Sequence, residues 1–298
     1  MEVKDNSPVW LNKSHPNFIR WKRAREIAIE RGKFVRSIVN QQYPVKNLTV
    51  LDLGSGEGGT SIVISENNFV ISFDISLTRL KRQFSSVIPK ESSTEESATQ
   101  YRDGFLSSIE MTGTGLVNGS ALQLPFTNNS FDLIIIQDVI EHLTELNDFY
   151  TEVKRVLKTN GVIYLSTPNK LSVFNLISDP HFGLPLVSIL KRQSIKKYFL
   201  KHFRKTDYNR NDIAQLFSLN ALLNLFKTDF KISLHTKYSV KELFNGNKGI
   251  VWSNFHLKLI TFCKSLKLDS LLIKIANDKI GFINRYFTPT FYMLLKIR

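Results

Sequence analysis

Short apolar runs and amphipathic stretches alternate between residues 48 and 170. The apolar runs are rich in β-branched residues and end at polar positions, which is typical of buried strands. Apolar residues at three- and four-residue spacings predict helices between them. The pattern predicts strands at 48–53, 69–73, near 116–117, 131–136 and 161–166, and helices at 59–67, 77–84 and 146–157. This alternation favours an α/β fold, a doubly wound parallel sheet covered by helices on both faces.

The two ends of the chain have a different pattern. Residues 15–40 place apolar side chains among Arg and Lys and predict one or two amphipathic helices, which Pro44 closes. Beyond Pro168 the periodicity is irregular. We expect there a basic helix over 191–205, a helix over 211–226, a strand at 230–234, a helical insertion over 240–287 and a last strand over 290–297. The polar stretch 91–100 predicts a flexible loop before the third strand.

Composition and charge limit the partners and the compartment that we expect for this protein. The formal net charge of +14 divides into +6 over residues 1–47, −7 over 48–185 and +15 over 186–298. The basic ends suit an anionic surface, a phosphorylated substrate or nucleic acid; a solvated basic face without a partner is the alternative. Cys263 is the only cysteine, which excludes an intramolecular disulfide and fits a reducing compartment. The first residues lack a secretory signal pattern, and no apolar stretch approaches the ~20 residues of a membrane span.

The stretch VLDLGSGEGG, residues 50–59, is the most informative part of the chain. Its glycines satisfy G-x-G-x-x-G, which alone is weak evidence for a dinucleotide site. Asp52 lies at the base of the turn and Glu57 inside it, where an acid would repel a pyrophosphate. The ligand should therefore bring positive charge. S-adenosylmethionine fits, because it carries an ammonium and a sulfonium and no phosphate.

Asp74 marks a second ligand contact. It lies twenty residues after Gly54, at the predicted end of the second strand, where an acid accepts the hydroxyls of a ribose in nucleotide-binding folds. The alternative is a helix N-cap, a role that also suits Ser76. Ribose binding is the interpretation we favour.

The stretches VLDLGSGEGG, FDIS, LQLPFTNNSFDLIIIQDVIEHL and EVKRVLKTNGVIYLSTPN together resemble class I S-adenosylmethionine-dependent methyltransferases, over residues 48 to about 170. The resemblance implies a seven-stranded Rossmann-like sheet of order 3-2-1-4-5-7-6 with the last strand antiparallel. It also implies a cofactor site. Its residues would be Gly54, Ser55 and Gly56 along the methionine portion, Asp74 and Ile75 at the ribose, Ser120 and Ala121 beside the adenine, and Gln137 and Asp138 at the methyl-transfer face. The family commonly has Asp where this chain has Ser120, so a charge-assisted contact is lost there.

On this basis we divide the chain into an N-terminal basic helical segment, residues 1–47, and a methyltransferase domain, residues 48–298. Within the domain we expect a flexible insertion at 85–115, a lid over the acceptor side at 170–210 and the basic helical insertion at 240–287.

Methyl transfer mainly requires alignment of nucleophile, methyl and sulfur. A base is needed only for a hydroxyl or a protonated amine. We expect His181, in the segment DPHFGLP, and Asp138 to be the catalytic residues; a histidine packed in a loop is the alternative for His181. Some relatives bind a metal through a motif similar to D-x-x-E-H, but for Glu141 and His142 we expect a bracing role and no metal.

The sequence thus predicts an S-adenosylmethionine-dependent methyltransferase acting on a small-molecule, glycan or lipid-linked acceptor, through oxygen. The alternatives are an RNA or protein methyltransferase that uses the basic C-terminal region, and a catalytically silent binding protein. The helix at 190–205 suits an anionic membrane surface, with a lid packed on the core as the equal alternative. We expect a cytoplasmic protein, with peripheral contact at the inner face of the membrane left open, as is the oligomeric state.

Overall fold

The computed structural model describes residues 13–14, 18–19, 22, 27–87, 113–208, 212–247 and 254–298. The predicted flexible loop at 91–100 and most of residues 15–26 in the predicted helical segment 15–40 lie outside these ranges. In the ranges that are described, no helix is both long enough and apolar enough to cross a membrane.

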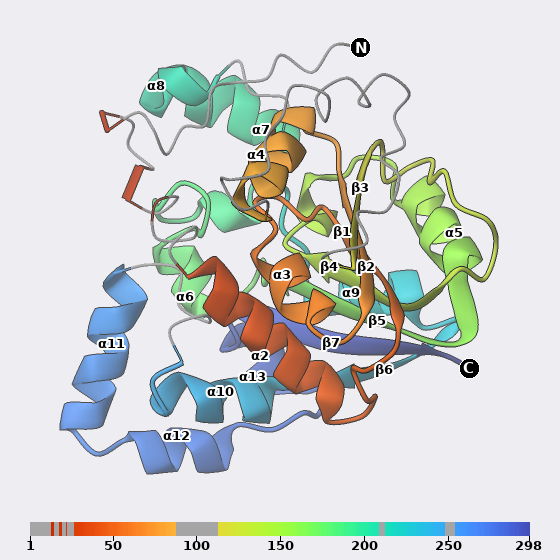
Figure 1. Ribbon diagram of the computed structural model, residues 1–298. Helices are drawn as coiled ribbons and strands as arrows, with labels where there is room; N and C mark the ends of the chain where they lie inside the picture. The colour runs from red at the N-terminus through yellow and green to blue at the C-terminus, as the bar shows by residue number, and fades with distance from the viewer. Residues whose placement is uncertain are drawn as a thin grey trace.

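One seven-stranded sheet forms the centre of the molecule (Figure 1). Its order is β3-β2-β1-β4-β5-β7-β6, and β7 pairs antiparallel with both of its neighbours. The predicted order and the antiparallel last strand are therefore confirmed. The strands are β1 (Thr49–Leu53), β2 (Phe69–Asp74), β3 (Thr114–Asn118), β4 (Phe131–Gln137), β5 (Leu157–Pro168), β6 (Phe230–Leu234) and β7 (Thr290–Ile297).

Helices cover both faces of the sheet (Figure 1). On one face, α5 (Leu146–Val156) and α9 (Leu219–Phe226) pack against alternate strand residues such as Leu51 and Ile134. On the other face, α2 (Ala28–Asn40) and α3 (Gly59–Ser65) pack against the intervening residues, such as Val50 and Ile135. Successive side chains of a strand point to opposite faces of the sheet, so each buried strand contributes side chains to both hydrophobic cores. The helix α4 (Leu77–Val87) follows β2.

Two predicted elements have different bounds. The helix expected over 211–226 begins only at Leu219, because the Ser218 hydroxyl accepts a hydrogen bond from the Ala221 backbone N–H at 3.3 Å and caps the helix there. The residues before it are not helical, and Phe217 bridges to Asn169 at the end of β5. The strand β5 is longer than the expected 161–166.

The segment between β5 and α9 contains short helical pieces: α6 (Val173–Ile177), η4 (Val187–Ile189), α7 (Arg192–Ser194), η5 (Ile195–Leu200), α8 (Lys201–Phe203) and η6 (Lys205–Asp207). The sequence predicted Ile195, Phe199 and Phe203 on one side of a single helix. Phe199 and Phe203 do lie together, with ring centroids 5.8 Å apart, although Phe203 is 73% exposed. The piece η5 is a π-helix, whose wider turn buries Ile195 and Leu200 together and leaves Phe199 against Phe182.

The remaining described helices are η3 (Ile140–His142), α10 (Thr236–Phe244), α11 (Asn254–Ser265), α12 (Asp269–Ile275) and α13 (Phe282–Tyr286). The last four occupy the region expected to be a helical insertion. In Figure 1, α11 and α12 lie at the periphery of the molecule, away from the sheet.

Candidate cofactor and acceptor site

The glycine turn connects β1 to α3 at the carboxyl edge of the sheet. Gly54 and Ser55 donate backbone hydrogen bonds to the Phe73 carbonyl, at 2.7 and 3.0 Å, and so join the turn to β2. Gly54 has φ +78°, and a Cβ there would lie 2.3 Å from a Val139 methyl. Both the backbone conformation and the close approach therefore require glycine at this position.

Asp74 ends β2 directly beside this turn. One of its carboxylate oxygens accepts the Gly56 backbone N–H at 2.9 Å, and the other accepts the Ser76 N–H at 2.8 Å. A carboxylate has about four acceptor positions, so two remain for a ligand's hydroxyls. Ile75 is 59% exposed next to it and can lie against a ring. This geometry suits the predicted ribose contact and also gives Asp74 the backbone-capping role.

Asp52 lies beneath the turn and is almost completely buried. Its carboxylate accepts a hydrogen bond from the Ser61 hydroxyl of α3 at 2.5 Å. Ser72 donates in turn to Ser61, and Gln83 of α4 donates to Ser72, each at 2.7 Å. Burial raises the pKa of Asp52 to about 6, although the Ser61 hydrogen bond acts against it. Asp52 therefore anchors the first turn of α3, and an ionised carboxylate is costly there.

Glu57, the acid inside the turn, is paired within the protein. Its carboxylate accepts two N–H groups of Arg82, the closer at 2.9 Å. The expectation that Glu57 needs positive charge from the ligand is therefore wrong, because Arg82 supplies that charge. The inference that the ligand is positively charged then depends on Asp52 and Asp74.

The residues expected at the adenine follow β3. The Ser120 hydroxyl accepts the Leu122 backbone N–H at 3.2 Å, and Ala121 packs at the edge of the core. Sequence reasoning missed Asn118, whose side-chain amide donates to the Asp74 carbonyl at 2.8 Å and holds the ends of β2 and β3 together. The position of Asn118 at the end of a predicted strand was the available signal.

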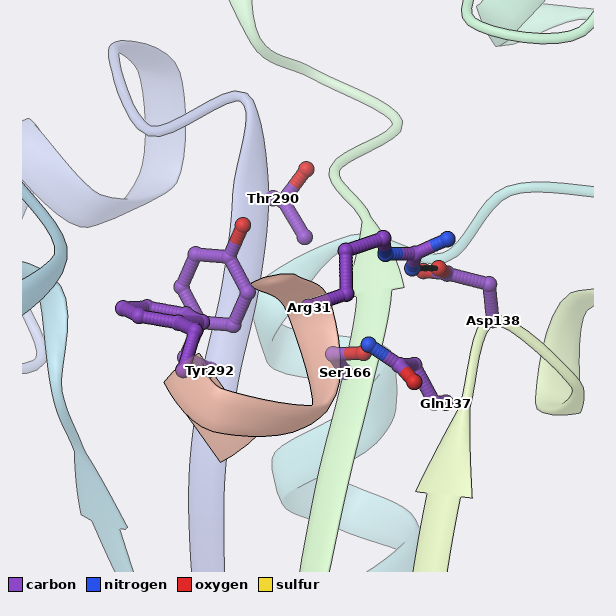
Figure 2. A pocket seen from close by; sticks show the side chains of 7 residues that line it. Arg31, Gln137, Asp138, Ser166, Thr290 and Tyr292 are labelled. Atoms are coloured by element: carbon purple, nitrogen blue, oxygen red, sulfur yellow. Dashed lines mark hydrogen bonds and ion pairs between the residues drawn. The ribbon is translucent and has the colours of Figure 1, made fainter. Parts of the chain in front are cut away.

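A narrow pocket lies where β4, β5 and β7 meet the first turns of α2 (Figure 2). Two predicted residues, Gln137 and Asp138, line it. Gln137 accepts a hydrogen bond from the Thr60 hydroxyl of α3 at 2.9 Å, which connects the pocket to the glycine turn. The other lining residues were not predicted: Arg31, Phe34, Ser166, Thr290 and Tyr292. Ser166 and Thr290 lie near strand ends at the same sheet edge, which was a usable signal.

Asp138 is the most distinctive side chain of the pocket. It has φ +54°, a left-handed conformation that few residues other than glycine adopt. Arg31 of α2 forms an ion pair with its Oδ2 (Figure 2). Its Oδ1 is buried and has no hydrogen-bond partner in the part of the chain that the structure describes. Burial raises the pKa of Asp138, and the Arg31 guanidinium acts in the opposite direction. The pocket thus contains an unused buried acceptor.

The position of Arg31 depends on close packing between α2 and α3. A Cβ on Gly32 would lie 2.9 Å from the Gly59 carbonyl and from the Thr60 Cα. A Cβ on Gly59 would lie 2.5 Å from the Ala28 side chain. Small residues on both helices therefore let the backbones approach, and α2 becomes a wall of the pocket.

His181 is not among the residues that line this pocket. Its ring packs edge-on against His142, with centroids 5.4 Å apart, and one ligand atom each of Glu141, His142 and His181 lie within 4.8 Å of one another. His142 Nδ1 lies 2.8 Å from the Asp212 carbonyl, and Glu141 accepts the Thr167 hydroxyl at 2.9 Å. Burial and the Asp138 carboxylate raise the pKa of Glu141 to about 8. One carboxylate and two imidazoles together can ligate a divalent transition metal. The hydrogen bond from Thr167 to Glu141 fits the bracing role predicted for Glu141.

Comparisons with known proteins identify a methyltransferase domain in this chain. Residues 51–165 match a family model described as a methyltransferase domain. An uncharacterized protein of Methanocaldococcus jannaschii is 29% identical over 174 residues, which cover 58% of this chain and 63% of that protein. Sterol 24-C-methyltransferase of Neurospora crassa is 30% identical over 118 residues, 39% of this chain and 26% of that protein. The chain spans less than two thirds of the length of the curated relatives it matches.

The fold likeness extends further than the sequence match. The crystal structure of an S-adenosylmethionine-dependent methyltransferase from Mesorhizobium loti superposes with a TM-score of 0.50 at 14% identity. The superposition covers 88% of this chain and 96% of that one. At this identity the likeness concerns the fold alone.

Proposed function

We propose, from the methyltransferase-domain match over residues 51–165, that this chain is a class I methyltransferase with S-adenosylmethionine as its cofactor. We further propose that it methylates a hydroxyl oxygen of a small-molecule, glycan or lipid-linked acceptor. The acceptor would bind in the pocket beside Asp138. The observation that carries the proposal is the buried Asp138 Oδ1, which has no partner among the described residues and lines the pocket beside the glycine turn.

The proposed cofactor position follows the edge of the sheet. The methionine portion would lie along Gly54, Ser55 and Gly56, and the ribose hydroxyls would use the remaining acceptor positions of Asp74. The adenine would lie between Ile75 and the turn at Ser120 and Ala121. Gln137, hydrogen bonded to Thr60 of the helix that follows the glycine turn, would then border the transferred methyl group.

In the proposed reaction, the acceptor oxygen attacks the methyl carbon as the carbon–sulfur bond breaks. The hydroxyl proton passes to Asp138 Oδ1, and S-adenosylhomocysteine leaves without the sulfonium charge. Arg31 holds the other carboxylate oxygen, which orients Asp138 toward the acceptor. A positioned base contributes about 10²–10⁴-fold to such a step. His181 remains the second candidate base; it lies against His142, and not in the pocket lining.

The variant Asp138→Asn tests the assignment well, because Asn tolerates the left-handed backbone and keeps the side-chain shape. We expect kcat to fall at least about a hundredfold while the affinity for S-adenosylmethionine stays unchanged. His181→Asn is the matched variant, with a smaller expected effect. If His181→Asn abolishes turnover and Asp138→Asn does not, the base assignment is reversed.

The acceptor class is identified by incubating the protein and labelled S-adenosylmethionine with fractionated cell extract. We expect label in the lipid or glycan fraction, in a form stable to base as an ether is. The sterol named for the Neurospora crassa relative makes a lipid acceptor a reasonable first assay, although that enzyme methylates carbon. Label in RNA or protein would refute the proposed acceptor, and absence of cofactor binding would favour the catalytically silent alternative.

A further inference from the structure

The last three helices before β7 expose an unusual number of large apolar side chains. Nine of the 22 exposed large hydrophobic residues in the described chain lie within residues 254–287. They are Phe262, Leu266, Leu268, Leu271, Ile275, Ile280, Phe282, Tyr286 and Phe287. We refer to residues 254–287, comprising α11, α12 and α13, as the C-terminal apolar segment.

Three exposed apolar pairs four residues apart follow the helices of this segment. The pairs are Phe262 of α11 with Leu266 directly after that helix, Leu271 and Ile275 on α12, and Phe282 and Tyr286 on α13. Residues at this spacing lie on one helix face, so each pair forms a short apolar stripe. From residue 257 to residue 275, no side chain is buried. From residue 257 to the end of α12, the side chains of these two helices therefore add nothing fully buried to the core.

The charges around these stripes are mostly positive. The segment contains five lysines and one arginine against two aspartates. Lys258, Lys264, Lys267, Lys274 and Lys279 are all exposed, and within the described chain none of them is in an ion pair. Exposed aromatic and aliphatic side chains flanked by lysines are the composition of helices that lie in the headgroup region of anionic bilayers.

The charge also argues against two other occupants. A second copy of this chain would bring the same unpaired lysines face to face in a two-fold interface, which like charges oppose. Single-stranded nucleic acid contacts basic and aromatic side chains, but leucine and isoleucine offer no stacking surface to its bases. Exposed large apolar side chains gathered on one segment of a folded protein are typical of an interaction surface. We propose that the C-terminal apolar segment is a docking surface for an anionic lipid bilayer.

This assignment places the membrane contact away from the helix at 190–205, for which the sequence left a membrane surface and a lid packed on the core as equal alternatives. There Ile195 and Leu200 are buried and Phe199 packs on Phe182, so most of the apolar side chains of this helix already pack within a small hydrophobic cluster. Tyr198 and Phe203 remain exposed beside lysines and provide the matched control. The docking proposal does not depend on methyl transfer, because vesicle binding is measured without cofactor or acceptor.

The test uses the full chain and sedimentation with lipid vesicles. We compare vesicles of phosphatidylcholine with vesicles in which half of the lipid is phosphatidylglycerol. We expect the wild type to bind only the anionic vesicles, and more weakly at high salt. In the variant Phe262→Ser/Leu271→Ser, we expect the partition coefficient to fall about tenfold for each side chain. In Lys264→Glu/Lys267→Glu, we expect a loss of about fivefold for each lysine.

The control variant Tyr198→Ser/Phe203→Ser should bind vesicles like the wild type. Circular dichroism should show all three variants folded, because none of the exchanged side chains is buried. Loss of binding in the control variant, or equal binding of neutral and anionic vesicles, would overturn the proposal. So would a wild type that does not bind vesicles, or one whose apolar segment instead mediates dimerisation or binding of a single-stranded oligonucleotide.

Discussion

Asp52 provides a quantitative test of the site, because the structure buries this acid and no basic side chain within the described ranges pairs with it. Burial raises the pKa of Asp52 to about 6 from 3.8 in an unfolded chain. Below pH 3.8 the carboxyl group is protonated in both states, and folding is not penalised. As the pH rises to 6 and above, the native state must bury a carboxylate, at a cost of about 3 kcal/mol.

The perturbation is Asp52→Asn, which removes the charge and retains an oxygen that can accept the Ser61 hydroxyl. The free energy of unfolding, from urea titrations without cofactor, is measured for both proteins at several pH values between 4 and 8. We expect the free energy of unfolding of the variant, relative to that of the wild type, to increase by up to about 3 kcal/mol between pH 4 and pH 8. We compare the difference in unfolding free energy between the two proteins, because Glu141 titrates in the same pH range in both and its contribution cancels.

The slope of that difference is more informative than its value at one pH, since Asn also changes the hydrogen bonds around Ser61. A difference that does not rise with pH would refute the assignment of a strongly raised pKa to Asp52. We further expect the variant to bind S-adenosylmethionine more weakly than the wild type, because the ammonium and sulfonium lose a compensating charge. The free energy of unfolding of the wild type should then depend less on pH when the cofactor is bound.

Three further predictions concern other parts of the site. Asp74→Ala should weaken S-adenosylhomocysteine binding by at least about a hundredfold in calorimetry, through the loss of two charge-assisted hydrogen bonds, without unfolding the protein; unchanged affinity would remove Asp74 from the site. Gly32→Val should destabilise the protein by about 1–3 kcal/mol in urea titrations, because its side chain would collide with Gly59; a variant as stable as the wild type would show that α2 can shift. Treatment with a chelator should leave methyl transfer unchanged if Glu141 is a brace, and activity restored only by an added divalent metal would contradict that role.

The positions of the strands along the chain could be predicted closely from the sequence. Buried parallel strands such as β1 and β4 are continuous β-branched runs that end at Gly54 or at polar residues, so their ends are marked locally. Their order in the sheet came from the resemblance to a family. The residues alone would have left the order open.

Contacts between distant residues could not be predicted. Arg31 and Asp138 are 107 positions apart, and nothing near either residue indicates that the other is its partner. The same holds for Glu57 and Arg82, whose ion pair removed a charge that sequence reasoning had assigned to the ligand. By contrast, the start of α9 was predictable, because Ser218 is a preferred N-cap residue.

The most direct test of the account is a crystal structure of the protein with S-adenosylmethionine. We expect both ribose hydroxyls to bind the Asp74 carboxylate, the methionine portion to lie on the glycine turn, and the methyl group to face the pocket that contains Asp138. A cofactor bound elsewhere, or a dinucleotide pyrophosphate occupying the turn in its place, would contradict the account.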